Sequence, residues 1–144
     1  MFNHILIATD GSEVSDRAAD QAIELAAKLG ARVLVLHVAP AEPAFAYFAR
    51  GIEGAGMEPG DAAKHSASYL DSVRVRAESK GVACTLHSVV DSRPYCEIVS
   101  IAQTQGCDLI VMGSHGRQGF DRLILGSETH KVLLSTSLPV LVCH

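Results

Sequence analysis

The stretch DLIVMGSHGRQGFDRLILGS, residues 108 to 127, joins an apolar run to a segment rich in glycine and basic residues. The apolar run shows little polar alternation, which is typical of a parallel strand covered on both faces. Gly113 and Gly116 stand where this strand should end. Nine residues later the chain reaches Gly126 and Ser127, where we expect a helix to begin. Open parallel sheets bind ligands beyond the carboxyl ends of their strands, so this stretch bears on both fold and site.

Outward from this stretch, short apolar runs alternate with helical patterns. The other expected strands are residues 4–10, 32–38, 82–90 and 139–144, and the third of the five strands alternates enough to suggest an edge position. Helices are expected over 14–29, with Ser12 as N-cap and Gly30 as stop, over about 63–77 and 95–102, and over 127–135. This alternation predicts one α/β domain over 1–144: a doubly wound, open, five-stranded parallel sheet with helices on both faces.

Composition narrows the class of protein. The chain has 144 residues, 48% of them hydrophobic and 19% charged, so it can bury one core without metal or disulfide support. A net charge of -4 argues against a nucleic-acid binder. No apolar run approaches the ~18 residues of a membrane span, and the N-terminus does not resemble a signal peptide. We therefore expect a cytoplasmic protein whose four cysteines are reduced and mostly buried.

Residues 39–60 do not fit the regular alternation, because they hold several prolines and glycines with an aromatic cluster. A connection of this length is uncommon inside a compact domain. We interpret it as a flap, a partner-contacting arm or a partly disordered loop, and a tolerated surface insertion explains it equally well.

The glycine-rich stretch suits phosphate oxygens. Gly113 and Gly116 have no Cβ to block a ligand and allow a turn whose amides point outward, which makes a nest for anions. At Gly126 and Ser127, free N–H groups and the positive end of a helix dipole also favour an anion. Arg117 adds positive charge if it points inward. A turn and a helix cap alone would explain single glycines here, but the combination favours phosphate binding.

Asp10 is the other informative residue, because it follows the first strand. If the first and fourth strands are adjacent, a crevice lies beyond their carboxyl ends. Asp10 then faces, across this crevice, the residues from Gly113 to Gly126, which we call the glycine loop. A carboxylate is poorly suited to phosphates, but it accepts hydrogen bonds from ribose hydroxyls or a base. The competing role is local capping of the first helix together with Ser12. We favour the nucleoside role.

Other nucleotide-binding and catalytic patterns are absent from the sequence. There is no GxxxxGK[ST] motif, no GxGxxG after the first strand, and no nucleophile elbow. A receiver-type domain needs paired acids after the first strand, whereas Asp10 stands alone. These absences leave the crevice at Asp10 and the glycine loop as the candidate site.

Over essentially its whole length the chain resembles a small universal stress protein. The nucleotide-binding members carry Gly, two residues, Gly, nine residues, then Gly followed by Ser or Thr, and this sequence matches every spacing. "ILIATDGS", "LHV", "DLIVMGSHGR" and "PVLVCH" are also family-like. The resemblance implies strand order 3-2-1-4-5, bound ATP, often with Mg or Mn bridging the phosphates, and a homodimer formed through the last strand, 139–144. The residues expected to bind nucleotide are Thr9, Asp10, Val38, Met112, Gly113, His115, Gly116, Arg117, Gly126, Ser127 and Glu128.

Within this set the resemblance assigns Asp10 and the Val38 backbone to the adenosine, and the glycines with Ser127 to the phosphates. Glu128 departs from the family, because a small or apolar residue is expected there. A carboxylate at this position either competes with phosphate for the helix terminus or points to solvent. The leading hypothesis is an ATP-responsive regulatory protein of the stress response. A slow ATPase or phosphotransferase using His115, Arg117 or Glu128 is the first alternative, and an interaction module without nucleotide is the second.

Overall fold

The computed structural model describes residues 1–41, 61–116 and 125–144, except for the side chains of 61–63. Within these residues the chain forms five strands and four helices in strict alternation. They are β1 (His4–Ala8), α1 (Glu13–Leu29), β2 (Arg32–Ala39), α3 (Asp61–Ser79), β3 (Cys84–Val90), α4 (Pro94–Thr104), β4 (Leu109–Gly113), α5 (Ser127–Ser135) and β5 (Val140–Cys143). The predicted order of elements is confirmed.

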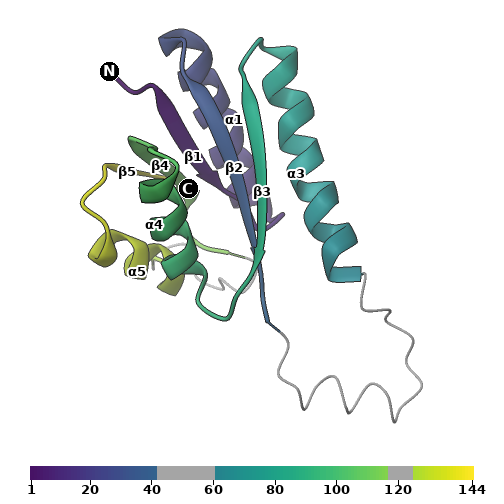
Figure 1. The fold of residues 1–144 in the computed structure, drawn as a ribbon, viewed down its shortest axis with the longest axis vertical. Coiled ribbons are helices and arrows are strands. Elements are labelled where there is room, and N and C mark those ends of the chain that lie inside the picture. The colour runs from purple at the N-terminus through teal and green to yellow at the C-terminus, as the bar shows by residue number, and fades with distance from the viewer. Residues whose placement is uncertain (42–60, 117–124) are drawn as a thin grey trace.

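All five strands lie in one parallel sheet in the order β3-β2-β1-β4-β5 (Figure 1). This order confirms the predicted doubly wound α/β fold. The edge position predicted for β3 is also confirmed, since β3 is an outer strand of the sheet and each of its residues is half-buried or exposed. Because β1 pairs with both β2 and β4, the turn after β1 lies between the chain segments that leave its two neighbours.

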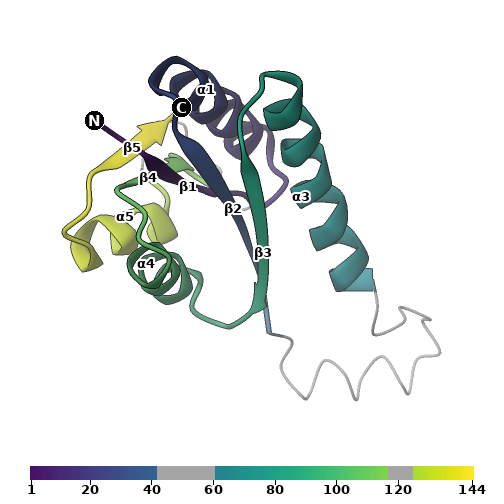
Figure 2. The ribbon, with the colours of Figure 1, turned by 45° about the horizontal axis from the view of Figure 1, so that its top comes forward.

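Helices cover both faces of the sheet, with α1 and α3 on one side and α4 and α5 on the other (Figure 2). Alternate residues of β2 show how the two cores are separated. Val33 and Val35 pack in the core under α1 and α3, whereas Leu34 and Leu36 pack under α4 and α5. Successive side chains of a strand point to opposite faces, so a central strand must be apolar at nearly every position.

The ends of α1 follow local rules that the sequence predicts. The Ser12 side chain accepts a hydrogen bond from the Ser15 N–H at 3.2 Å, and Gly30 ends the helix with φ of 67°. Strand β1 ends at Ala8, two residues before the predicted Asp10. Its last predicted residues are instead part of the turn that leads into α1.

The flap or arm expected at 39–60 falls almost wholly on residues 42–60, which lie outside the described residues.

The four cysteines are free, with Cys107 and Cys143 buried and the other two half-buried. Burial raises the pKa of the Cys107 thiol to about 11. It therefore stays protonated at neutral pH and acts as a core residue.

Candidate functional site

The glycine-rich excursion closes on itself where β4 ends. The Gly126 N–H donates to the Ser114 carbonyl at 2.6 Å, and the Thr129 hydroxyl donates to the Gly113 carbonyl at 2.9 Å. The start of α5 therefore lies against the end of β4, as the sequence predicts. Residues 117–124 lie outside the described residues, so the prediction for Arg117 is not tested by the structure.

Close packing explains two glycines of this motif, Gly113 and Gly126. Gly113, Gly116 and Gly126 do not have a left-handed φ, in contrast to Gly11. A Cβ on Gly113 would stand 2.8 Å from Val14 Cγ1, and one on Gly126 would stand 2.9 Å from His115 Cα. Two of the glycines thus have a packing role that does not require a ligand.

Gly116 differs, because the group beside it belongs to the candidate site. A Cβ on Gly116 would stand 2.6 Å from Asp10 Oδ2. The carboxylate at the end of β1 therefore lies directly against the glycine loop after β4. The structure confirms the predicted juxtaposition, which depends on the pairing of β1 with β4.

Asp10 also has the local role that competed with nucleoside binding. Its Oδ1 accepts the Ser12 N–H at 2.9 Å, within the turn that precedes α1. The Thr9 hydroxyl lies 3.2 Å from Ser15 Oγ and accepts the Gly11 N–H at 3.3 Å. Thr9 is buried and secures the turn. Asp10 is half-buried, with one oxygen in the turn and the other at the glycine loop.

The backbone of Val38 faces the same crevice. The Thr9 N–H donates to the Leu36 carbonyl at 2.9 Å, whereas the Asp91 N–H donates to the Ala39 carbonyl at 3.0 Å. Alternate residues of a strand direct their N–H and C=O groups to the same neighbour. Val38 therefore points its backbone groups to the β1 side, at a level where β1 has already ended.

The N-terminus of α5 supplies further donors. Gly126 is its N-cap, and within residues 1–41, 61–116 and 125–144 no side chain caps the helix. The first N–H groups of a helix have no partner inside it and carry its positive end. Because the Gly126 N–H is bonded to Ser114, the amides of 127–129 and the exposed Ser127 hydroxyl are the donors that remain.

Glu128 does not compete for this helix terminus. Its Oε2 accepts the Tyr95 N–H at 3.0 Å, and its Oε1 lies 3.2 Å from Lys131 Nζ. The carboxylate thus caps α4, whose N-cap residue, Arg93, makes no capping hydrogen bond through its side chain within the described part of the chain. The prediction that Glu128 contacts nucleotide gains no support from this geometry, and neither does its candidacy as a catalytic group.

The remaining predicted residues differ in their surroundings. His115 is half-buried, and its Nδ1 lies 3.1 Å from Ser114 Oγ. Met112 is a buried core residue that pairs with Val142 of β5, so its surroundings favour a packing role over ligand contact.

Sequence reasoning missed Tyr69, whose ring packs on Gly11 behind the Asp10 turn. The signal was its place on α3 one helical turn before Val73, on the buried face.

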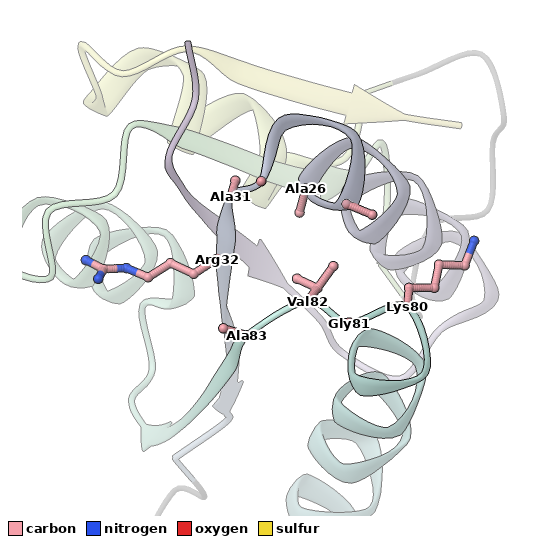
Figure 3. Close-up of a pocket in the computed structure, with 9 residues that line it drawn as sticks. Ala26, Ala31, Arg32, Lys80, Gly81, Val82 and Ala83 are labelled. Atoms are coloured by element: carbon pink, nitrogen blue, oxygen red, sulfur yellow. The ribbon is translucent and has the colours of Figure 1, made fainter.

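A cavity of about 200 Å³ lies at the opposite ends of the strands from Asp10, at the amino ends of β2 and β3. Figure 3 shows Ala26, Ala31 and Val82 around it, with Arg32 and Lys80 extending away in different directions. Its position excludes it from the crevice formed by the carboxyl ends of the strands.

Among the described residues, no helix is both long and apolar enough to cross a membrane. The same part of the chain holds no group of three or more His, Cys, Asp or Glu side chains arranged for a metal ion.

Known proteins resemble the chain over its full length. The family model described as the universal stress protein family matches residues 1–144. The universal stress protein YxiE of Bacillus subtilis (strain 168) is 33% identical, over 99% of each chain. The solved structure of MJ0577 from Methanocaldococcus jannaschii has a TM-score of 0.82 and 28% identity, covering 99% of this chain and 96% of that one. A universal stress protein from Archaeoglobus fulgidus, solved in complex with dAMP, shares the fold at a TM-score of 0.72 and 21% identity, covering 100% and 98%. The chain belongs to the universal stress protein family.

Proposed function

We propose that this protein binds ATP in the crevice between the ends of β1, β2 and β4, and that it acts as a nucleotide-dependent regulator. The observation that carries the proposal is the meeting of Asp10 with Gly116, because it joins a carboxylate to the glycine loop. A related protein of the same fold has been solved with dAMP, which supports a nucleotide as ligand.

Each part of the nucleotide has suitable groups in this crevice. The backbone N–H and C=O of Val38 suit the edge of a base, and Asp10 suits ribose hydroxyls. The N-terminus of α5 and the Ser127 hydroxyl suit phosphate oxygens. Thr9 supports the turn that carries Asp10. His115 and Gly116 border the proposed phosphate end, where the chain leaving β4 lies beside the N-terminus of α5.

Mg²⁺ or Mn²⁺ is compatible with this arrangement. Mg²⁺ at a nucleotide takes most of its ligands from phosphate oxygens and water, with one or two carboxylates at most. Asp10 supplies a carboxylate to the crevice, and it lies beside the glycine loop. The residues therefore fit a cation that arrives with the phosphates.

Regulation requires that nucleotide favour one of two states of the protein. We expect the loop from Gly113 to Gly126 to respond to the nucleotide, because both of its ends border the proposed site. Gly116 lies against Asp10, and the Gly126 N–H is bonded to Ser114. Strand β5, which follows α5, is the edge through which we propose that the protein dimerises. Leu141 of β5 and Leu133 of α5 are exposed, and Leu134 is 75% exposed, so this end of the molecule presents apolar surface.

The first test is chemical. Freshly purified protein is denatured, and the released small molecules are separated by chromatography. The proposal predicts an adenine nucleotide in this fraction, or ATP binding by calorimetry at millimolar concentration or below. Protein that releases no adenine nucleotide and binds no ATP would refute it. Calorimetry with inorganic triphosphate serves as a control for binding through charge alone.

A further inference from the structure

A group of four side chains lies behind the Asp10 turn, on the face of the sheet covered by α1 and α3. We call it the Tyr69 cluster: Tyr69, His65 and Ser66 of α3, with His37 of β2. None of these residues belongs to the predicted nucleotide site. They nonetheless contact the backbone next to Asp10 and next to Val38, the two residues that we propose bind the nucleoside.

Tyr69 defines the position of the turn. Gly11 has φ of 76°, and a Cβ at this residue would overlap Tyr69 Cε1. The ring therefore occupies the space that a side chain would take and lies directly on the backbone of Gly11. A turn in this position is prevented from relaxing toward α3, because the aromatic ring fills the space behind it.

The ring is itself secured from the other side. The His37 ring meets Tyr69 edge-on, with centroids 5.4 Å apart and planes inclined by 67°. His37 is only 6% exposed, and its Nδ1 lies 2.7 Å from Ser66 Oγ. The His65 ring stacks on Tyr69 at 6.3 Å. Edge-to-face and stacked aromatic contacts restrict the orientation of a ring, so Tyr69 is a firm support.

The sequence positions of these residues give the cluster its functional meaning. Gly11 follows Asp10 directly, and His37 directly precedes Val38. The Tyr69 cluster therefore touches the backbone one residue away from each proposed nucleoside contact. A carboxylate that recognises a ribose hydroxyl must be held within a fraction of an ångström of its productive position.

We propose that Tyr69 is a positioning residue, which orients Asp10 toward the ribose and thereby sets the preference of the site for ribonucleotides over deoxyribonucleotides. This inference rests on the proposed ATP site. The Archaeoglobus fulgidus relative holds dAMP, so preference is expressed as a ratio of affinities and not as the presence or absence of binding.

The test is a double-mutant cycle with Tyr69→Ala and Asp10→Asn, read as the ratio of the dissociation constants for dATP and ATP. A hydrogen bond to a charged group corresponds to about tenfold or more in affinity, so we expect about that ratio for the unmodified protein. Tyr69→Ala should reduce the ratio severalfold. In the Asp10→Asn background, Tyr69→Ala should change the ratio no further, because the charge-assisted hydrogen bond that Tyr69 positions is already lost.

Three further measurements separate positioning from general stability. Tyr69→Phe keeps the ring that contacts Gly11 and His37, so it should retain the ratio. Val75→Ala, at an exposed position of the same helix, should also leave the ratio unchanged. Circular dichroism verifies that each variant is folded. If Tyr69→Ala does not fold, Tyr69→Leu takes its place, and its ratio should fall as well, because a branched aliphatic chain cannot match the flat ring.

The outcomes distinguish this inference from the proposal beneath it. An unmodified protein that binds neither ATP nor dATP overturns the ATP site itself. An unmodified protein that binds both equally, or a folded Tyr69→Ala that keeps the full ratio, overturns the positioning role and leaves the ATP site standing. Additive effects in the cycle also overturn the positioning role, because they would show that Tyr69 acts on the ratio independently of Asp10.

Discussion

Replacing Gly116 by alanine tests whether the contact between Asp10 and the glycine loop belongs to the nucleotide site. The new Cβ would stand 2.6 Å from Asp10 Oδ2, well inside van der Waals contact. The carboxylate is the end of a flexible side chain, so it moves rather than the backbone. Its displacement removes a ribose contact of about 1.5–3 kcal/mol, which corresponds to about tenfold to a hundredfold in the dissociation constant for ATP.

The same substitution should affect the free energy of unfolding much less. Gly116 does not have a left-handed φ, and Asp10 is only half-buried, so we expect a change within about 1 kcal/mol. Gly81→Ala is the matched control. Gly81 has φ of 71° with no atom within 4 Å of the new Cβ, and it lies at the amino end of β3. Alanine there costs about 1–2 kcal/mol of stability and leaves ATP affinity unchanged.

The assay pairs calorimetric titration with ATP and urea denaturation for both variants. The expected pattern is crossed: Gly116→Ala weakens binding with little loss of stability, and Gly81→Ala does the reverse. The reasoning fails if Gly116→Ala binds ATP as tightly as the unmodified protein. It fails equally if Gly81→Ala weakens binding to the same extent, because binding would then follow stability.

Three other predictions concern stability and assembly. Burial, with a contribution from Arg32, lowers the pKa of His4 below its ordinary 6.5. As pH drops below that value, the unfolded chain binds a proton at this histidine more readily than the folded protein does, so the free energy of unfolding falls. Urea denaturation at several pH values should show this fall, and His4→Phe should remove most of it. Glu128→Gln should cost about 1 kcal/mol by weakening the cap on α4, and a thermal midpoint equal to that of the unmodified protein would contradict the cap. Leu141→Glu should convert the proposed homodimer to a folded monomer in sedimentation experiments, whereas an unmodified protein that is monomeric at high concentration would refute dimerisation through β5.

Local rules and strand patterning made the fold predictable. Ser12 and Gly30 mark the ends of α1 because capping and left-handed φ depend on residues close in sequence. The polar residues within β3 identified an edge strand because an edge strand has no fully buried side chains here. The meeting of Asp10 with the glycine loop followed from the pairing of β1 with β4, which the fold class and the family resemblance already implied.

The details of the site were less predictable, because they depend on contacts between distant residues. The carboxylate of Glu128 caps a different helix through the Tyr95 N–H, and spacing in the sequence gives no sign of that partner. Gly113 is glycine because α1 packs on it at Val14, a reason that concerns neither a turn nor a phosphate. The support of Gly11 by Tyr69 likewise arises from the docking of α3. Each of these contacts depends on helix packing, which periodicity alone does not determine.

The central claim is that backbone N–H groups of two chain segments, together with Val38, surround an adenine nucleotide. The most direct measurement is the change in backbone amide chemical shifts on titration with Mg-ATP, for which a 15.2 kDa chain is well suited. We predict the largest chemical-shift changes at Val38, at Gly116 and in the first turn of α5. We predict little change around Gly81, which lies near the amino ends of the strands. Changes centred on the cavity beside Gly81, or no changes at millimolar ATP, would contradict the account.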